Sequence, residues 1–161
     1  MESAERVMLE AEIHAQIGEI ERVYRLIEDR QKTKGIAGTE SLAYQLHNLY
    51  CAFEDLFQIV ARVFDNQIVR SERYHIELLK RMEIAVPGVR PAVISDSSFR
   101  LLDSLRAFRH FFRHAYAYEL DPRKVKLALD DAEELRVRYQ EEVDTFLKTL
   151  STEPESPKAE T

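Results

Sequence analysis

An apolar stripe between residues 40 and 67 constrains the fold of this chain more than any other feature of its sequence. Its apolar side chains recur at helical spacing: Leu42, Leu46, Leu49, Phe53, Leu56, Phe57, Val60 and Phe64. A stripe this broad is typical of a helix at the centre of a bundle. The 161 residues include only four Gly and five Pro, and a fold rich in hairpins needs more turn residues than that. The sequence therefore predicts an all-α fold.

The same periodicity and its interruptions predict where the other helices lie. Glycines within residues 32–38, the run Pro87-Gly88-Val89-Arg90-Pro91, and the tripeptide Leu120-Asp121-Pro122 mark breaks. Thr39 and the residues at positions 95–98 are candidate N-caps. We expect an antiparallel bundle of four to five helices in a single domain, residues 1–150, and a disordered polar tail, residues 151–161. The expected helices cover about residues 3–31, 40–67, 71–84, 99–118 and 122–150.

Composition narrows the setting in which the protein works. The first six residues carry charge and lead into no apolar segment, so we expect no secretory signal. The longest uncharged run, residues 41–53, contains Gln45, His47 and Asn48 and is too short and too polar to span a membrane. Cys51 is the only cysteine, which excludes an internal disulfide and a cysteine-based zinc site. We expect a cytoplasmic protein without a membrane segment, a metal or another cofactor.

Charge is distributed unevenly along the chain. The total of −6 argues against nucleic-acid binding when it is taken alone. Residues 100–126, however, hold seven basic and three acidic side chains, which leaves +4 there and −10 in the rest of the chain. A local basic segment on an acidic body can still bind phosphates.

The expected helix at residues 99–118 has two chemically different faces. At 100° per residue, Leu101, Leu105, Phe108 and Phe112 share one face. The opposite face carries three arginines and two histidines: Arg106, Arg109, Arg113, His110 and His114. Such a stripe is often only a solvated surface. The same residue types also suit phosphodiester cleavage, because histidine titrates near neutral pH and arginine donates a fixed fork of hydrogen bonds to phosphate.

The spacing raises a geometric difficulty for this second interpretation. Arg109 and His114 are five residues apart, which places them about 140° apart around a regular helix. Three explanations are open: the helix distorts near its end, the arginine side chain wraps around, or a second subunit completes the site. We favour the second subunit.

The pattern Arg-x4-His-x-Tyr, here Arg109, His114 and Tyr116 with the polar His110 after the arginine, resembles the motif of the HEPN superfamily. Within that superfamily the chain is most similar to HepT-like ribonuclease toxins, over roughly residues 42–150. The apolar segment around residues 50–57 and the late position of the motif in a small helical chain fit the resemblance. The first helix and the tail make this chain longer than the commonest members, and Arg113 is an additional cation inside the motif.

The resemblance implies a fold, an activity and partners. HEPN proteins are all-α and commonly form dimers in which the two motifs face one cleft, so a homodimer is expected. Many are metal-independent endoribonucleases that use the RNA 2′-hydroxyl as nucleophile. By that analogy His114 is the acid–base residue, Arg109 stabilises the charge on phosphorus, His110 orients or polarises, and Arg106 and Arg113 bind RNA.

The resemblance also implies a regulatory partner. HepT-like toxins pair with a minimal nucleotidyltransferase antitoxin, which adds AMP to the tyrosine of the motif. That tyrosine corresponds to Tyr116, although Tyr118 lies close enough to leave the acceptor ambiguous.

The sequence also offers alternatives to this motif: a metal site, a structural ion pair and a non-catalytic function. Glu72-x-x-His75 occurs once, whereas a di-iron bundle needs two such pairs, so a surface coincidence is the simpler account. Glu54 lies within the apolar stripe and could pair with Arg109 or Arg113, in a structural role as readily as in a site. A second functional hypothesis is a non-catalytic helical module that binds a nucleotide or a partner protein. Burial of Arg109 and the histidines in ion pairs with Glu54 or Asp55 would favour that module.

Overall fold

The computed structural model describes residues 1–65, 68, 71–117 and 119–152. Across these ranges it is helical, apart from one isolated antiparallel bridge between Val86 and Arg90. The elements in chain order are α1 (Ser3–Arg30), α2 (Gly35–Phe64), α3 (Tyr74–Glu83), α4 (Asp96–Arg113), the short 3₁₀ helix η1 (Ala115–Ala117), α5 (Pro122–Arg136) and α6 (Tyr139–Thr152). The prediction of an all-α fold is confirmed.

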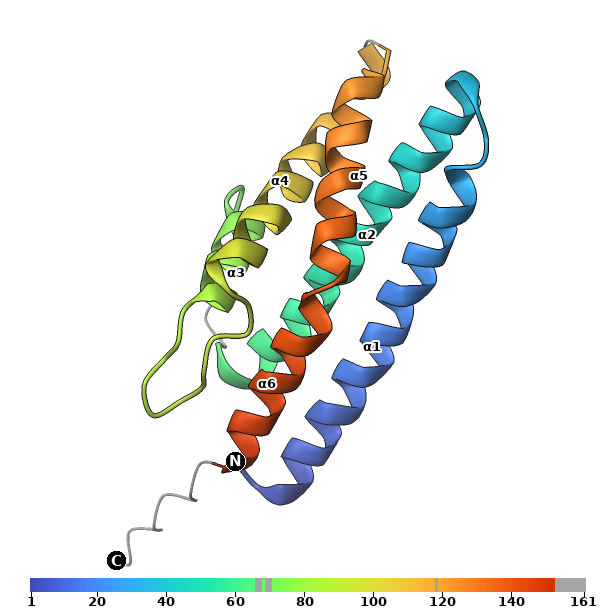
Figure 1. Cartoon of the computed structure of the whole chain (residues 1–161). Coiled ribbons are helices and arrows are strands. Elements are labelled where there is room, and N and C mark those ends of the chain that lie inside the picture. Colours follow the sequence, from blue (N-terminus) through green and yellow to red (C-terminus); the bar gives the residue numbers. More distant parts are fainter. Residues whose placement is uncertain (66–67, 69–70, 118, 153–161) are drawn as a thin grey trace, which may run out of the picture.

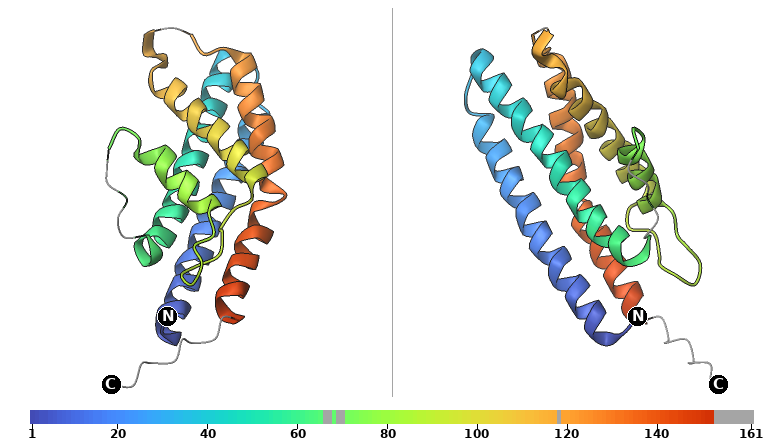
Figure 2. Two further views of the ribbon diagram at one scale, coloured as in Figure 1. Left: turned by 90° about the vertical axis from the view of Figure 1, so that its left-hand side faces the viewer. Right: turned by 180° about the vertical axis from the view of Figure 1, so that it is seen from behind.

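The long helices form an antiparallel bundle. In Figure 1, α1 ascends, α2 descends beside it, α4 ascends again, and α5 continued by α6 descends to the end at which the chain begins. The two further views in Figure 2 show α3 on the outside of the bundle, next to α2 and α4. The α1–α2 loop and the α4–α5 turn therefore lie at the same end of the molecule.

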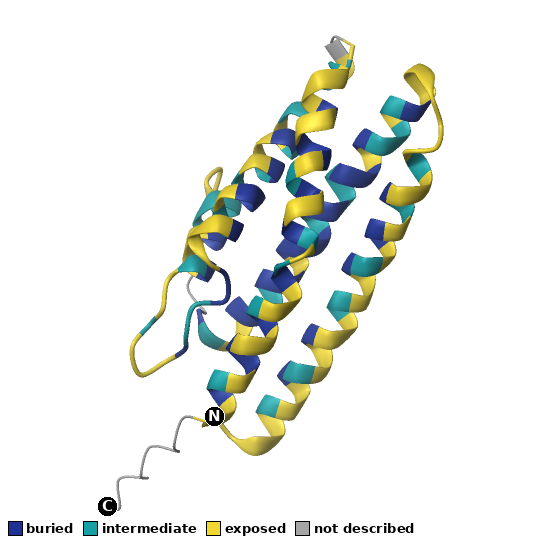
Figure 3. Ribbon diagram, viewed as in Figure 1, coloured by how far each residue is buried: buried dark blue, intermediate teal, exposed yellow. Residues whose placement is uncertain are grey.

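The core consists of the apolar stripes that these helices turn toward one another (Figure 3). Its centre is a group of aromatic rings from three helices. Tyr139 of α6 stacks on Tyr24 of α1, with ring centroids 6.2 Å apart, and meets Phe53 of α2 edge-on at 4.9 Å. Burying such rings supplies much of the stabilisation available to a domain of this size.

Several helix ends differ from those predicted. Helix α2 begins at Gly35 rather than near residue 40, and its N-cap is Lys34, so the prediction of Thr39 as N-cap is wrong. Thr39 instead lies inside the helix, where its hydroxyl donates to the carbonyl of Gly35 at 3.3 Å. Gly35 has a φ of +82°, a conformation that glycine adopts without strain and that lets the chain leave the loop directly into helix.

The helix expected at residues 122–150 is divided in two at Val137 and Arg138. Neither glycine nor proline marks this point in the sequence. The division accompanies the insertion of Tyr139, whose hydroxyl donates to Glu21 of α1 at 2.6 Å. Ser151 and Thr152, expected in the tail, belong to α6, and the remaining residues of that expected tail, 153–161, lie outside the described residues.

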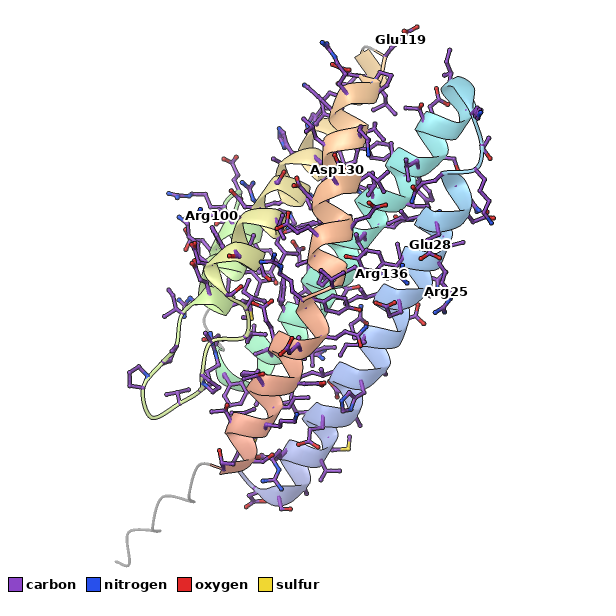
Figure 4. All side chains as sticks on the ribbon, viewed as in Figure 1. Arg25, Glu28, Arg100, Glu119, Asp130 and Arg136 are labelled. Carbon is purple, nitrogen blue, oxygen red and sulfur yellow. The ribbon has the colours of Figure 1, made fainter. Side chains whose placement is uncertain are left out.

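Charged side chains join α1 to the α5–α6 junction. Arg136 bonds Glu28 and, at 3.0 Å, Glu21 (Figure 4 labels Arg136 and Glu28). Burial acts to raise the pKa of Glu21, but hydrogen bonds from Tyr139 and Arg136 outweigh it and lower the pKa. This network fixes α1 against the last two helices.

A buried arginine organises the loop between α3 and α4. The Arg90 side chain is 0% exposed and forms an ion pair with Asp65, at the end of α2, at 3.0 Å. Its remaining donors bond the carbonyls of Arg81, Ile84 and Pro91 at 2.7–3.1 Å. Because every side of this guanidinium is hydrogen-bonded, its burial costs far less than that of an unpaired charge.

Among the described residues, no helix is both long enough and apolar enough to cross a membrane.

Candidate functional site

Helix α4 presents the motif because its apolar side is fully used by the core. Ser95 caps the helix, accepting a hydrogen bond from the backbone N–H of Ser98 at 3.2 Å. Leu102 and Leu105 are completely buried, and Phe108 nearly so. The basic residues are consequently left on the sides of α4 that face solvent and the edge of α2.

Arg109 lies against α2. Its guanidinium adjoins the Cys51 thiol, and although burial raises the pKa of that thiol, Arg109 opposes the rise. Burial lowers the pKa of His47, a hydrogen bond with Asn48 counteracts this, and the charges of Arg109 and Arg113 lower it further. In the part of the chain that the structure describes, Arg109 has no ion pair with a carboxylate. The site thus keeps a partly buried cation that pairs with no carboxylate of the described residues.

Glu54, considered above as a partner for these arginines, is engaged elsewhere. Its carboxylate accepts a hydrogen bond from Nδ1 of His75 in α3 at 2.7 Å. Burial raises the pKa of Tyr50, and the charge of Glu54 and a hydrogen bond to it raise that pKa further. His75 therefore has a structural contact that its spacing to Glu72 did not indicate: it joins α3 to the acidic residue inside the apolar stripe of α2.

The two histidines of the motif pack against each other, with their ring planes tilted by 37°. The rings of His110 and His114 lie 4.4 Å apart, and Nδ1 of His114 is 2.8 Å from the carbonyl oxygen of His110. A carbonyl oxygen only accepts hydrogen bonds, so Nδ1 carries the proton, and Nε2 of neutral His114 keeps its lone pair. Both residues are exposed. His114 is thus oriented to take a proton from a bound group.

Helix α4 ends one residue before His114, which is the C-cap. The expected continuation to residue 118 is wrong, and η1 replaces the final helical turn. The helix is therefore distorted at its end, which was one of the three explanations offered for the wide angle between Arg109 and His114. No hydrogen bond connects Arg109 to His114 among the described residues.

Arg106 and Arg113, the expected RNA-binding residues, differ in how they are held. Arg106 is paired within α4 to Asp103, at 2.8 Å. Arg113 is exposed, and over the described ranges it forms no ion pair. Of the two, Arg113 is the one whose charge stays available to a phosphate.

Tyr116 stands free of the bundle, with 91% of its surface exposed. It lies in η1, two residues after His114. Nearby, the Lys124 ammonium sits 4.2 Å from the centre of the Phe111 ring, and this contact ties α5 to the end of α4. Tyr118, the competing acceptor, lies outside the described residues.

A family model described as HepT-like protein matches residues 41–150, more than half of the chain. The chain belongs to the HepT-like protein family. The match confirms the resemblance drawn from the sequence, and it includes all of the motif but not α1. No curated protein and no solved structure matches the chain.

Within this HepT-like protein, the sequence pattern identified the α4 face but missed its surroundings on α2 and α3. From the sequence, His47 was not singled out as a site residue, and Cys51 was considered only for a disulfide or a zinc site. Both lie on the side of α2 next to Arg109. A prediction that α2 packs against α4 could have identified them as neighbours of the motif. No group of three or more potential metal ligands occurs in the described ranges.

Proposed function

We propose that this HepT-like protein is a metal-independent endoribonuclease toxin that cleaves single-stranded RNA through the residues of α4. The proposal rests on one arrangement near the C-terminal end of α4, which places a cation without a described anionic partner and a histidine oriented to act as a base in the same region. Arg109 has no carboxylate partner among the described residues, and His114 has its Nδ1 proton held by a carbonyl. Single-stranded RNA is the expected substrate because its bases and 2′-hydroxyls are accessible.

The chemistry assigned to these residues is a transesterification. Nε2 of His114 accepts the proton of the 2′-hydroxyl, whose oxygen attacks the neighbouring phosphorus. Arg109 and Arg113 donate hydrogen bonds to the phosphate oxygens, which gain charge in the transition state. The bond from phosphorus to the 5′-oxygen breaks, and that oxygen takes a proton from a protonated histidine. A 2′,3′-cyclic phosphate and a 5′-hydroxyl are the products, while His110 orients the ring of His114 through its ring contact and its carbonyl oxygen.

The proposed active form is a homodimer. Arg109 is turned toward α2, whereas His114 packs against His110 beyond the end of the helix. A second copy that brings its own α4 to the same cleft supplies the missing half of each site. The same separation is the observation that favours the alternative, a non-catalytic module that binds a nucleotide or a partner protein. Against that alternative, neither Arg109 nor the two histidines form an ion pair with Glu54 or Asp55.

Control of the toxin is proposed to act on Tyr116. A nucleotidyltransferase antitoxin that adds AMP there would place negative charge and bulk two residues from His114. The 91% exposure of Tyr116 supports this assignment, because an enzyme must reach its hydroxyl.

The test is cleavage of a mixed RNA pool in the presence of EDTA by the wild-type protein, Arg109→Ala and His114→Ala. Arg100→Ala is the matched control, since Arg100 is an exposed arginine of α4 that is paired to Asp96 and lies far from the motif (Figure 4). We expect cleavage by the wild type and the control and none by the two motif variants. Absence of cleavage by a wild-type dimer whose Tyr116 is shown unmodified by mass spectrometry would sink the nuclease and favour the binding module.

A further inference from the structure

A groove at one end of the bundle adjoins the motif. It has a volume of about 980 Å³ and lies between the start of α2 and the turn that joins α4 to α5. This volume is near the upper end of the roughly 300–1,000 Å³ of typical small-molecule sites. The groove includes Ala115 and Tyr116, which directly follow His114 in the chain. A ligand bound there lies beside His114, the general base of the proposed reaction.

The walls of this groove are apolar and aromatic. Ile36 projects from the first turn of α2 with 75% of its surface exposed, opposite Tyr116 at 91%. Phe112 and Leu120 also line the groove. Two large, exposed apolar side chains on either side of a hollow form a surface that a flat apolar ligand would cover. Aromatic side chains bind unstacked nucleobases in this way, because every base has a π face.

Charge distinguishes the interior of the groove from its surroundings. Two carboxylates, Glu40 and Glu119, line it, and neither forms an ion pair with a described residue. Figure 4 shows Glu119 at this end of the bundle. The flanking segments are basic, with Lys32 and Lys34 before α2 and Arg113 before the turn. Carboxylates repel a phosphate but accept hydrogen bonds from a base, so the base enters the groove while the backbone stays with the cations outside.

The geometry points to a base-recognition subsite for the RNA substrate in this groove, with guanine as the preferred base. Guanine is the one standard base whose Watson–Crick edge offers two neighbouring N–H donors, which a single carboxylate oxygen pair can accept together. The base stacks against Tyr116 and Ile36, and Glu40 or Glu119 accepts from its edge. The subsite rests on the proposed function for the identity of its ligand, but it is tested by binding rather than by cleavage.

The experiment measures binding of fluorescein-labelled hexanucleotides to full-length His114→Ala, which keeps the RNA intact. The probes are oligouridylate and the same hexamer with one central guanosine, adenosine or cytidine. The groove variants, each added to His114→Ala, are Ile36→Ser and the double substitution Glu40→Gln/Glu119→Gln. Matched controls are Leu127→Ser and Glu133→Gln, which alter exposed residues of α5 outside the groove. Because Ile36 and both carboxylates are exposed, these variants should fold normally, which circular dichroism checks.

We expect the guanosine hexamer to bind about tenfold more tightly than oligouridylate, and the double carboxylate variant to abolish that difference. Ile36→Ser should weaken the guanosine complex severalfold, and the controls should change neither affinity. Equal affinity for all four hexamers, or a guanosine preference that survives the double substitution, would overturn the subsite and leave the groove to another ligand, such as a partner protein. Cleavage of mixed RNA by the wild type alongside equal affinities would overturn the subsite alone. A guanosine preference without cleavage would support the subsite and contradict the nuclease.

Discussion

Two arginines of this protein, Arg90 and Arg109, differ in the hydrogen-bond and ion-pair partners that the fold gives them. Arg90 is completely buried, and its donors are used by Asp65 and by three backbone carbonyls. Arg109 is half-buried beside Cys51 and His47, and it has no carboxylate partner in the described part of the chain. Arg90 lies at the end of α2, and Arg109 lies against its side.

The difference shows how the function of a charge can be inferred from its partners. A buried cation with every donor bonded holds together the segments that supply the acceptors, as Arg90 does for α2, α3 and the loop before α4. A cation that the fold leaves un-neutralised next to solvent costs stability unless something outside the chain binds it. Arg109 and Arg113 are therefore expected to contribute to activity, and Arg90 to stability.

Replacing Arg90 should produce the largest effect on folding. Arg90→Met leaves the buried Asp65 with only its longer ion pair to Arg81, at 4.0 Å, and three carbonyls without donors. We expect the free energy of unfolding to fall by about 3–5 kcal/mol. Urea unfolding followed by circular dichroism measures this. The double variant Arg90→Met/Asp65→Leu removes the orphaned charge and should recover part of the loss. A loss below about 1 kcal/mol in the single variant would show that Arg90 does not organise the loop.

Replacing Arg109 should have the converse result. Arg109→Ala should lower the rate of RNA cleavage by about 100-fold or more, as loss of one donor to a developing oxyanion does in other enzymes. Its free energy of unfolding should change by less than about 1 kcal/mol, because no ion pair is broken. Single-turnover kinetics and urea unfolding on one preparation give both values. A large loss of stability would place Arg109 with Arg90 and remove the contrast.

The Glu21 network between α1 and α6 should give an intermediate effect. Tyr139→Phe removes a hydrogen bond to a charged group and should cost about 1–2 kcal/mol at neutral pH. Because the pKa of Glu21 is lowered in the folded protein, its contribution is present above the ordinary carboxyl pKa and is lost as the pH falls through the folded value. The variant should therefore lose less stability on acidification than the wild type does. Parallel acid-titration curves for the two proteins would contradict this account.

His47 should give the smallest effect, through pH alone. Its pKa is lowered in the folded state, so below the ordinary histidine value of about 6.5 the unfolded chain binds more protons and stability declines as the pH falls. His47→Gln should flatten that slope between about pH 6.5 and 5. Arg113→Gln should raise the pKa of His47 measured by NMR, since one of the nearby positive charges is removed. An unchanged pKa would mean that the charge of Arg113 does not contribute to the shift.

The sequence predicted the faces of the helices better than their ends. The division of α4 into an apolar side and a basic side follows from 3.6-residue periodicity, and the structure keeps it. The end of α4 at Arg113 could not be predicted, because the strongest break signal, Asp121-Pro122, comes eight residues later. The break before Tyr139 likewise depends on its contacts with Tyr24 and Glu21, which are more than 100 residues away in the sequence.

Pairings between distant segments were also beyond periodicity. Nothing near Arg90 indicates that Asp65 is its partner, and Glu54 could not be assigned to His75 rather than to Arg109 from spacing alone. The motif itself was found because its residues lie close together on one helix. Its surroundings were missed because they come from α2 and α3.

In the proposed homodimer, Arg109 of one copy acts together with His114 of the other. This claim is tested most directly by mixing the inactive variants Arg109→Ala and His114→Ala, after unfolding and refolding them together so that the subunits exchange. A mixed dimer then contains one site with both residues intact, so we expect about one quarter of wild-type RNA cleavage, given that half of randomly paired dimers are mixed. Refolding each variant alone should restore nothing. Cleavage by the wild type with no recovery in the mixture would contradict the claim and place both residues of each site in a single chain.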